Sequence, residues 1–139
     1  NKIKKIKQGS WVHQHDVDEK ENYFLFLDNN LSSEKSRVNS HNRIIILDNE
    51  LNKVSEIYSE VLENYKISTL TEGLIEIDED KIIFEETNNG ALYRLSEKGV
   101  DWLYTNFHDE NIYRLNWSRI ISNKLLNDFL KSKNKTICD

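Results

Sequence analysis

The chain has 139 residues and a formal net charge of −5. This length corresponds to one ordinary domain, and the negative charge argues against a nucleic-acid surface, because phosphate contacts need clustered Lys and Arg. The basic run at 2–7 is too short to change this and suits a solvated edge strand. No apolar stretch approaches the roughly 20 residues that a membrane-spanning helix needs. The chain begins at Asn1 and contains no Met, so we expect a longer parent protein.

Four short β-strands are predicted in the first part of the chain. Residues with strand character are separated by turn signals rich in Asn and Asp, and they lie at 11–18, 22–30, 42–48 and 53–59. The continuous apolar run Ile44–Leu47 predicts a strand that is covered on both faces. The connection at 30–41 is long for a hairpin loop, so it is either a mobile surface loop or a functional insertion.

The same order of strands returns in the second part of the chain, at 71–78, 80–89, 90–96 and 98–106. In both series an apolar strand ends in an acidic residue that Asn-Asn follows closely, and a later strand carries a Tyr near its end. Four strands repeated every 40–50 residues are typical of β-propeller blades. The sequence therefore predicts an all-β fold with two four-stranded blades, 11–59 and 66–105, as part of one β-propeller domain.

After the second blade the pattern changes. A partial strand is predicted at 113–120 and a short amphipathic helix at 122–132, where Leu125, Leu126 and Phe129 recur at helical spacing. Two blades cannot close a propeller ring and would leave strand edges unpaired. We therefore expect the remaining blades to come from the parent chain or from another chain. The lone Cys138 cannot form an internal disulfide, so it is either a free thiol or bridged to a missing part.

The candidate chemistry centres on His13 and His15, which lie on the first predicted strand. Residues two apart on a strand point to the same face, and the innermost strand of a propeller blade lines the central channel. The pair could bind a metal, act as acid and base, or supply a nucleophile. A metal site needs at least three ligands, and His41 and His108 lie at no metal-ligand spacing, so no metal is predicted. Asp16 points to the opposite face and is expected to make a blade-to-blade hydrogen bond.

Several motifs together resemble the arylsulfotransferase family over roughly residues 10–120. The string QHDVD at 14–18 is similar to the Gln-His element of that family, and the strands at 22–30, 42–48 and 53–59 follow in the family's order. The blade that follows is also similar to the family's pattern, through Gly73, Gly90, Gly99, Trp102, Tyr104 and Ile112-Tyr113-Arg114.

The resemblance implies a six-bladed propeller that is exported, hence periplasmic or secreted. It implies an enzyme that moves a sulfuryl group from a phenolic sulfate ester to a phenolic acceptor without the phosphoadenosine donor or any other cofactor. The matching nucleophile is His15, which would form a sulfohistidine. Candidate substrate-binding residues are His13, a hydroxyl at the start of the next blade (Ser68, Thr69 or Thr71) and Arg114, if the strand at 113–120 is innermost.

A second reading from another class stays open. Many propellers carry the fold without chemistry, so the chain is alternatively a non-catalytic binding or scaffold propeller. The aromatic residues could stack on a phenol or pack between blades. A propeller that holds a metal through His13 and His15 is a third, more distant alternative.

Overall fold

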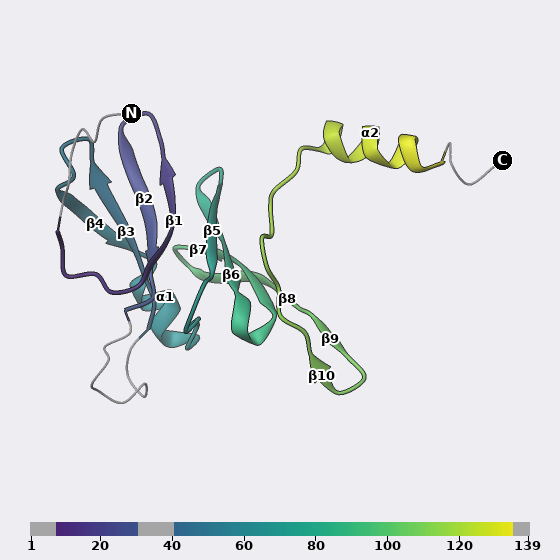
Figure 1. The fold of residues 1–139 in the computed structure, drawn as a ribbon, viewed down its shortest axis with the longest axis horizontal. Helices are drawn as coiled ribbons and strands as arrows, with labels where there is room; N and C mark the ends of the chain where they lie inside the picture. The colour runs from purple at the N-terminus through teal and green to yellow at the C-terminus, as the bar shows by residue number, and fades with distance from the viewer. Residues whose placement is uncertain (1–7, 31–40, 135–139) are drawn as a thin grey trace.

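The computed structural model describes residues 8–30 and 41–134 (Figure 1). It contains two four-stranded antiparallel sheets, and in each the strands are neighbours in chain order. The first sheet consists of β1 (Gln14–Glu19), β2 (Tyr23–Asp28), β3 (Arg43–Asp48) and β4 (Lys53–Ile57), and the second of β5 (Leu74–Asp78), β6 (Lys81–Glu86), β7 (Ala91–Ser96) and β8 (Gly99–Thr105). The predicted β-rich, antiparallel, repeated character is confirmed, and the described residues form no closed sheet.

The tight hairpins fall where the turn signals predicted them. Asp48 ends β3, and its Oδ1 accepts hydrogen bonds from the backbone N–H groups of Glu50 (2.9 Å) and Asn52 (2.8 Å). This carboxylate closes the turn in the way that Asp commonly does. At the β7–β8 turn, Gly99 has a φ of 135°, which favours glycine over a residue with a side chain.

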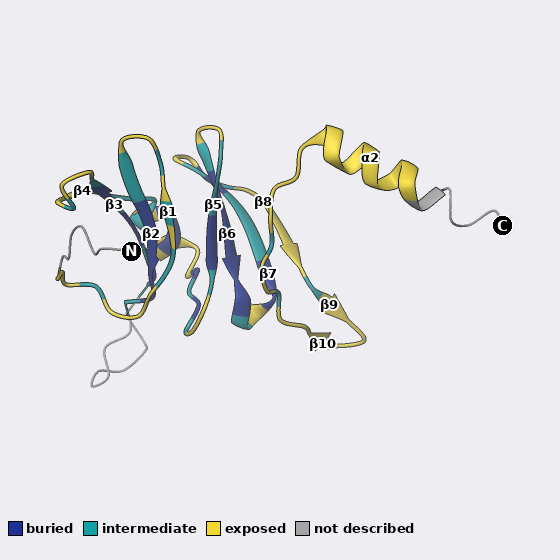
Figure 2. Cartoon of the chain, turned by 45° about the horizontal axis from the view of Figure 1, so that its top comes forward, coloured by how far each residue is buried: buried dark blue, intermediate teal, exposed yellow. Residues whose placement is uncertain are grey.

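The hydrophobic core lies between the two sheets (Figure 2). Leu25 and Leu27 of β2 point toward the second sheet, and Phe84 of β6 points back toward them. The remaining buried members of this core are Ile44, Val61, Leu62, Ile67, Ile75, Ile82 and Leu95. The predicted burial of the run Ile44–Leu47 on both faces is also confirmed, because Ile44 joins this core while Ile45 and Leu47 pack with Phe26 on the other side.

A buried amide network ties the first sheet to the segment that leads into the second. Asn42, just before β3, donates through Nδ2 to the carbonyl oxygens of Asn29 (3.1 Å) and Thr69 (3.0 Å), and its Oδ1 accepts from the Thr69 N–H. Asn29 also donates to the Thr69 carbonyl (3.1 Å). These three residues are buried, so their hydrogen bonds satisfy backbone groups that water does not reach.

Two predicted strands differ from the structure. The strand expected at 53–59 ends at Ile57, because Tyr58 has a φ of 59° and the short helix α1 (Ser59–Asn64) follows. The strand expected at 113–120 is wrong: this segment has no strand pairing and follows a small hairpin of β9 (Phe107–His108) and β10 (Asn111–Ile112). The loop predicted at 30–41 lies almost entirely outside the described residues.

The predicted C-terminal helix is confirmed as α2 (Asn123–Asn134). It stands clear of both sheets in the structure (Figure 1). Within residues 8–30 and 41–134, no helix has the length and apolar character that a membrane crossing requires.

Replacing Asn42 should destabilise the fold strongly. Asn42→Ala removes the acceptor of the Thr69 N–H and leaves the Asn29 carbonyl without its amide donor, both in a buried position. Each buried polar group that loses its partner costs about 1–3 kcal/mol, so we expect a loss of at least about 2 kcal/mol in the free energy of unfolding. Urea unfolding of Asn42→Ala beside the exposed control Asn22→Ala measures this, and equal losses in the two variants would contradict the proposed role of the network.

Candidate functional site

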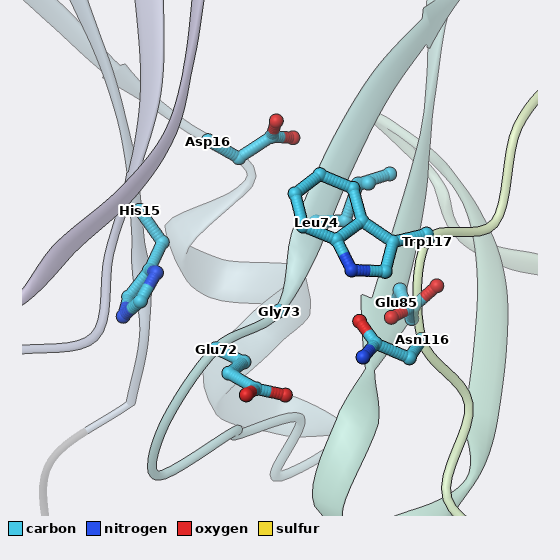
Figure 3. Close-up of a pocket in the computed structure, with 8 residues that line it drawn as sticks. All are labelled: His15, Asp16, Glu72, Gly73, Leu74, Glu85, Asn116 and Trp117. Carbon is cyan, nitrogen blue, oxygen red and sulfur yellow. The ribbon is translucent and has the colours of Figure 1, made fainter.

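A cavity of about 260 Å³ opens between the first strands of the two sheets, β1 and β5, and the segment that follows β10 (Figure 3). Its walls come from β1, the start of β5, β6 and residues 116–117. The lining residues are His15, Asp16, Glu72, Gly73, Leu74, Glu85, Asn116 and Trp117. The predicted nucleophile, His15, therefore lies at a cavity.

A β-bulge in β1 gives this wall its shape. His15 pairs with Leu27 and Val17 with Phe26, so Asp16 is the extra residue, with a φ of 49°. Such a bulge re-aims the side chains around it, and here both His15 and Asp16 border the cavity (Figure 3). The Oδ2 atom of Asp16 accepts a 2.7 Å hydrogen bond from the Ile75 N–H of β5. The predicted hydrogen bond of Asp16 from one repeat to the next is thus confirmed.

The sheets can approach this closely because residue 73 is a glycine. Gly73 has a φ of 106°, and a Cβ atom there would lie 2.8 Å from Leu27 Cδ2 and 2.5 Å from Thr69 Cγ2. Both contacts are too short for any other residue, so the position requires glycine. Gly73 thereby brings the start of β5 against β2 and forms the floor of the cavity.

The wall opposite His15 is built around Glu85 (Figure 3). This residue is 1% exposed, its Oε1 accepts from the Thr87 hydroxyl (3.0 Å), and its Oε2 accepts from the Ser118 N–H (2.7 Å). Oε2 therefore holds the segment after β10 to the second sheet, while Oε1 is engaged by the Thr87 hydroxyl just after β6. Trp117 precedes that anchor, and the Arg119 guanidinium lies 5.6 Å from its ring centroid.

The electrostatic character of the cavity is acidic. Three carboxylates line it, from Asp16, Glu72 and Glu85, and the lining contains no Lys or Arg. Burial raises the pKa of the Asp16 carboxyl, which the hydrogen bond from Ile75 only partly offsets. Sulfuryl transfer needs cationic or hydrogen-bond donating groups around the peripheral oxygens. The described lining has neutral donors in Asn116 and Trp117, and three carboxylates beside them.

The other predicted site residues do not join His15. His13 lies before β1 with a φ of 57°, so the strand alternation that would have put it on the face of His15 does not apply, and that expectation is wrong. Thr71 is exposed, and Arg114 is an exposed residue of the unpaired segment after β10, so the expected inner-strand position of Arg114 is also wrong. None of these three lines the cavity.

Thr69 is fully buried and serves the connection between the sheets. Its hydroxyl lies 3.0 Å from the Thr71 carbonyl oxygen and 2.9 Å from Asn88 Oδ1. Ser68, the third hydroxyl candidate, donates its backbone N–H to Glu86 Oε1 at 2.9 Å. In the described parts of the chain, no group of three or more His, Cys, Asp or Glu residues is close enough to hold a metal ion.

Four lining residues were not predicted: Glu72, Leu74, Glu85 and Asn116. Trp117 belongs to the aromatic residues that were expected either to stack on a phenol or to pack between blades. For Glu85 the sequence did carry a signal, because this charge interrupts the apolar strand at 80–89 at a position where the first repeat has Leu27. Each is the second-to-last residue of its strand. Glu72 and Trp117 lie in left-handed conformations, with φ values of 60° and 65°, and neither residue type indicates such a conformation.

The raised pKa of Asp16 predicts a specific pH dependence. Between the ordinary value of 3.8 and its raised folded value, the folded state binds more protons than the unfolded state. Asp16 therefore contributes stability that is present below pH 3.8 and is lost as the pH rises through the raised pKa. Asp16→Asn keeps an oxygen for the Ile75 N–H without the charge, so its free energy of unfolding should lack this fall and equal or exceed that of the wild type at pH 7.

Asp16→Ala is the matched variant, because it removes the acceptor as well as the charge. We expect it to lose about 1–3 kcal/mol at pH 7. Urea unfolding of the three proteins at several pH values makes the comparison. A wild type and an Asp16→Asn variant with the same pH profile would show that the charge of Asp16 carries no burial cost.

No family model matches this chain. No curated protein and no solved structure matches it either.

Proposed function

We propose that this chain is a two-blade segment of a β-propeller and acts as a binding or scaffold module to which further sheets attach. The observation that carries this proposal is that one spatial relation between successive segments, with the same backbone conformation and the same kind of hydrogen bond, occurs twice. It first relates the first sheet to the second, and then relates the second sheet to the segment at 117–121.

The backbone supports the repetition. His13, Glu72 and Trp117 have φ values of 57°, 60° and 65°. His13 lies two residues before His15, which pairs with the second-to-last residue of β2, and Glu72 lies two residues before Leu74, which pairs with the second-to-last residue of β6. Trp117 shares this left-handed conformation, so three successive segments begin with one backbone conformation.

The contacts between successive inner segments repeat as well. Asp16 of β1 accepts a 2.7 Å hydrogen bond from the Ile75 N–H, and Glu76 of β5 accepts a 2.7 Å hydrogen bond from the Ile120 N–H. Ile75 and Ile120 each lie three residues after the left-handed residue. Sheets that follow one another by a constant step form a propeller when enough of them are present, and 117–121 would then be the inner strand of a third blade.

A second candidate function is sulfuryl transfer through His15, as the resemblance implies. The half-buried His15 beside a cavity with the indole of Trp117 favours it, because an aryl group could stack there. The carboxylates of Asp16, Glu72 and Glu85 oppose it, because they would repel an anionic sulfate ester. We therefore rank the non-catalytic module first. The exported location implied by the resemblance remains part of the second candidate.

The repeated spatial relation predicts protected amides in the segment at 117–121. Ser118 and Ile120 donate their N–H groups to Glu85 and Glu76, so both amides should exchange with solvent about tenfold or more slowly than in an unstructured peptide. Nuclear magnetic resonance exchange rates test this. Glu76→Ala should release the Ile120 amide while the exposed control Glu97→Ala leaves it protected, and an unprotected Ile120 in the wild type would contradict the propeller proposal.

The ranking of the two functions predicts the result of a transfer assay. With 4-nitrophenyl sulfate as donor and phenol as acceptor, we expect this chain to release no 4-nitrophenolate above the buffer rate. Release that is abolished in His15→Ala and kept in the exposed control His108→Ala would establish sulfotransferase activity and would overturn the ranking.

A further inference from the structure

Helix α2 carries an exposed apolar stripe in its described part (Figure 2). Leu125, Leu126, Phe129 and Leu130 are 57%, 38%, 54% and 49% exposed, and their spacing puts them on one side of the helix. A 12-residue helix without tertiary packing is only marginally stable in water. The Ser122 hydroxyl accepts the Leu125 N–H at 3.2 Å and caps the first turn, but one cap does not replace packing of the stripe.

A partly uncovered surface is the outer face of the second sheet, defined here by Ile83, Glu85, Leu92, Arg94, Trp102 and Tyr104. Ile83 and Glu85 are buried in it, while Trp102 and Tyr104 are exposed. Ile83 pairs with Arg94 and Arg94 with Trp102, while Glu85 pairs with Leu92 and Leu92 with Tyr104. Phe84 and Leu95 alternate with these residues and point into the core, so the six residues share the opposite side. Trp102 and Tyr104 are 42% and 50% exposed there.

A short tether connects the helix to this face. The Ile120 N–H is bound by Glu76 of β5, and α2 begins at Asn123, three residues later. Three residues span at most about 10 Å, so the start of α2 stays beside the inner edge of the sheet. A helix of this length extends about 18 Å, and four strands span about 14 Å from the first to the last. Lying across the sheet, α2 therefore reaches from β5 to β8.

We propose that α2 folds back as a cap on the outer face of the second sheet, with its apolar stripe against Leu92, Trp102 and Tyr104. The cap buries the exposed stripe of α2 against the exposed rings of Trp102 and Tyr104, which is the driving force for closure. Lys124, Asp128 and Lys131 lie on the other side of the helix and stay in solvent. A further sheet that binds this face must first displace α2, so the cap would regulate access to it.

Spin labelling tests the cap on the whole chain. In a Cys138→Ser background, a nitroxide is attached at Asp128→Cys, on the polar side of α2, so that the apolar stripe stays intact. Closure should broaden the amide signals of Trp102 and Tyr104 and leave those of β3 unaffected. Adding Phe129→Glu should abolish the broadening, whereas the matched control Lys131→Glu on the polar side should preserve it.

Mixing experiments show whether the helix covers its own chain or a second copy of the chain. Spin-labelled chain without isotope is added to ¹⁵N-labelled chain without a spin label. Broadening only within one chain supports the cap, and broadening between chains means that α2 binds a second copy and overturns it. Absence of broadening in both samples also overturns the cap. Protection of the Ile120 amide is read in the same spectra, so failure of the cap is distinguishable from failure of the propeller proposal.

Discussion

The structure depends on the buried amide of Asn42, because this side chain fixes the position of the segment that connects the first sheet to the second. Its three hydrogen bonds join the end of β2 and the start of β3 to Thr69 in the connecting segment. Apolar packing between the sheets is not directional and would allow them to slide or rotate. The amide geometry removes that freedom, and it places Gly73 and β5 directly against β2.

The cavity at His15 is a consequence of this junction. The bulge at Asp16 and the left-handed turn at Glu72 open a space between inner strands that the apolar core does not fill. Two of its polar residues already make structural hydrogen bonds, because Asp16 accepts from the Ile75 N–H and Glu85 accepts from the Ser118 N–H. A residue whose hydrogen bonds hold separate segments together is poorly suited to changing its state during a reaction, and this favours a structural role for Asp16 and Glu85.

The parts of the fold that follow from local patterns could be predicted from the sequence. Alternation, apolar runs and Asn- or Asp-rich turns located the eight strands of the two sheets, because hairpins between neighbouring strands depend on short-range signals. The helix α2 followed from the spacing of Leu125, Leu126 and Phe129.

Features that depend on distant contacts could not be found in this way. His13 has a left-handed backbone conformation, so the strand alternation that predicted the direction of its side chain does not apply. No property of a histidine side chain predicts this conformation. The segment at 113–120 has strand-like composition but no partner strand, and a strand needs a neighbour for its hydrogen bonds. The burial of Thr69 depends on Asn42, which lies 27 residues earlier. Helix α1 was not predicted, because the repeat pattern indicated that the preceding strand continues to Ser59.

The outer faces of the two sheets are not equally covered. On the outer side of the first sheet, Phe26, Ile45 and Leu47 are at most 6% exposed, and Trp11 packs edge-on against Phe26 with ring centroids 5.3 Å apart. That face is already covered by its own chain. The outer face of the second sheet keeps Trp102 and Tyr104 about half exposed. If further sheets attach as proposed, the exposed aromatic rings of Trp102 and Tyr104 favour attachment after the second sheet rather than before the first, because burial of these rings stabilises the contact.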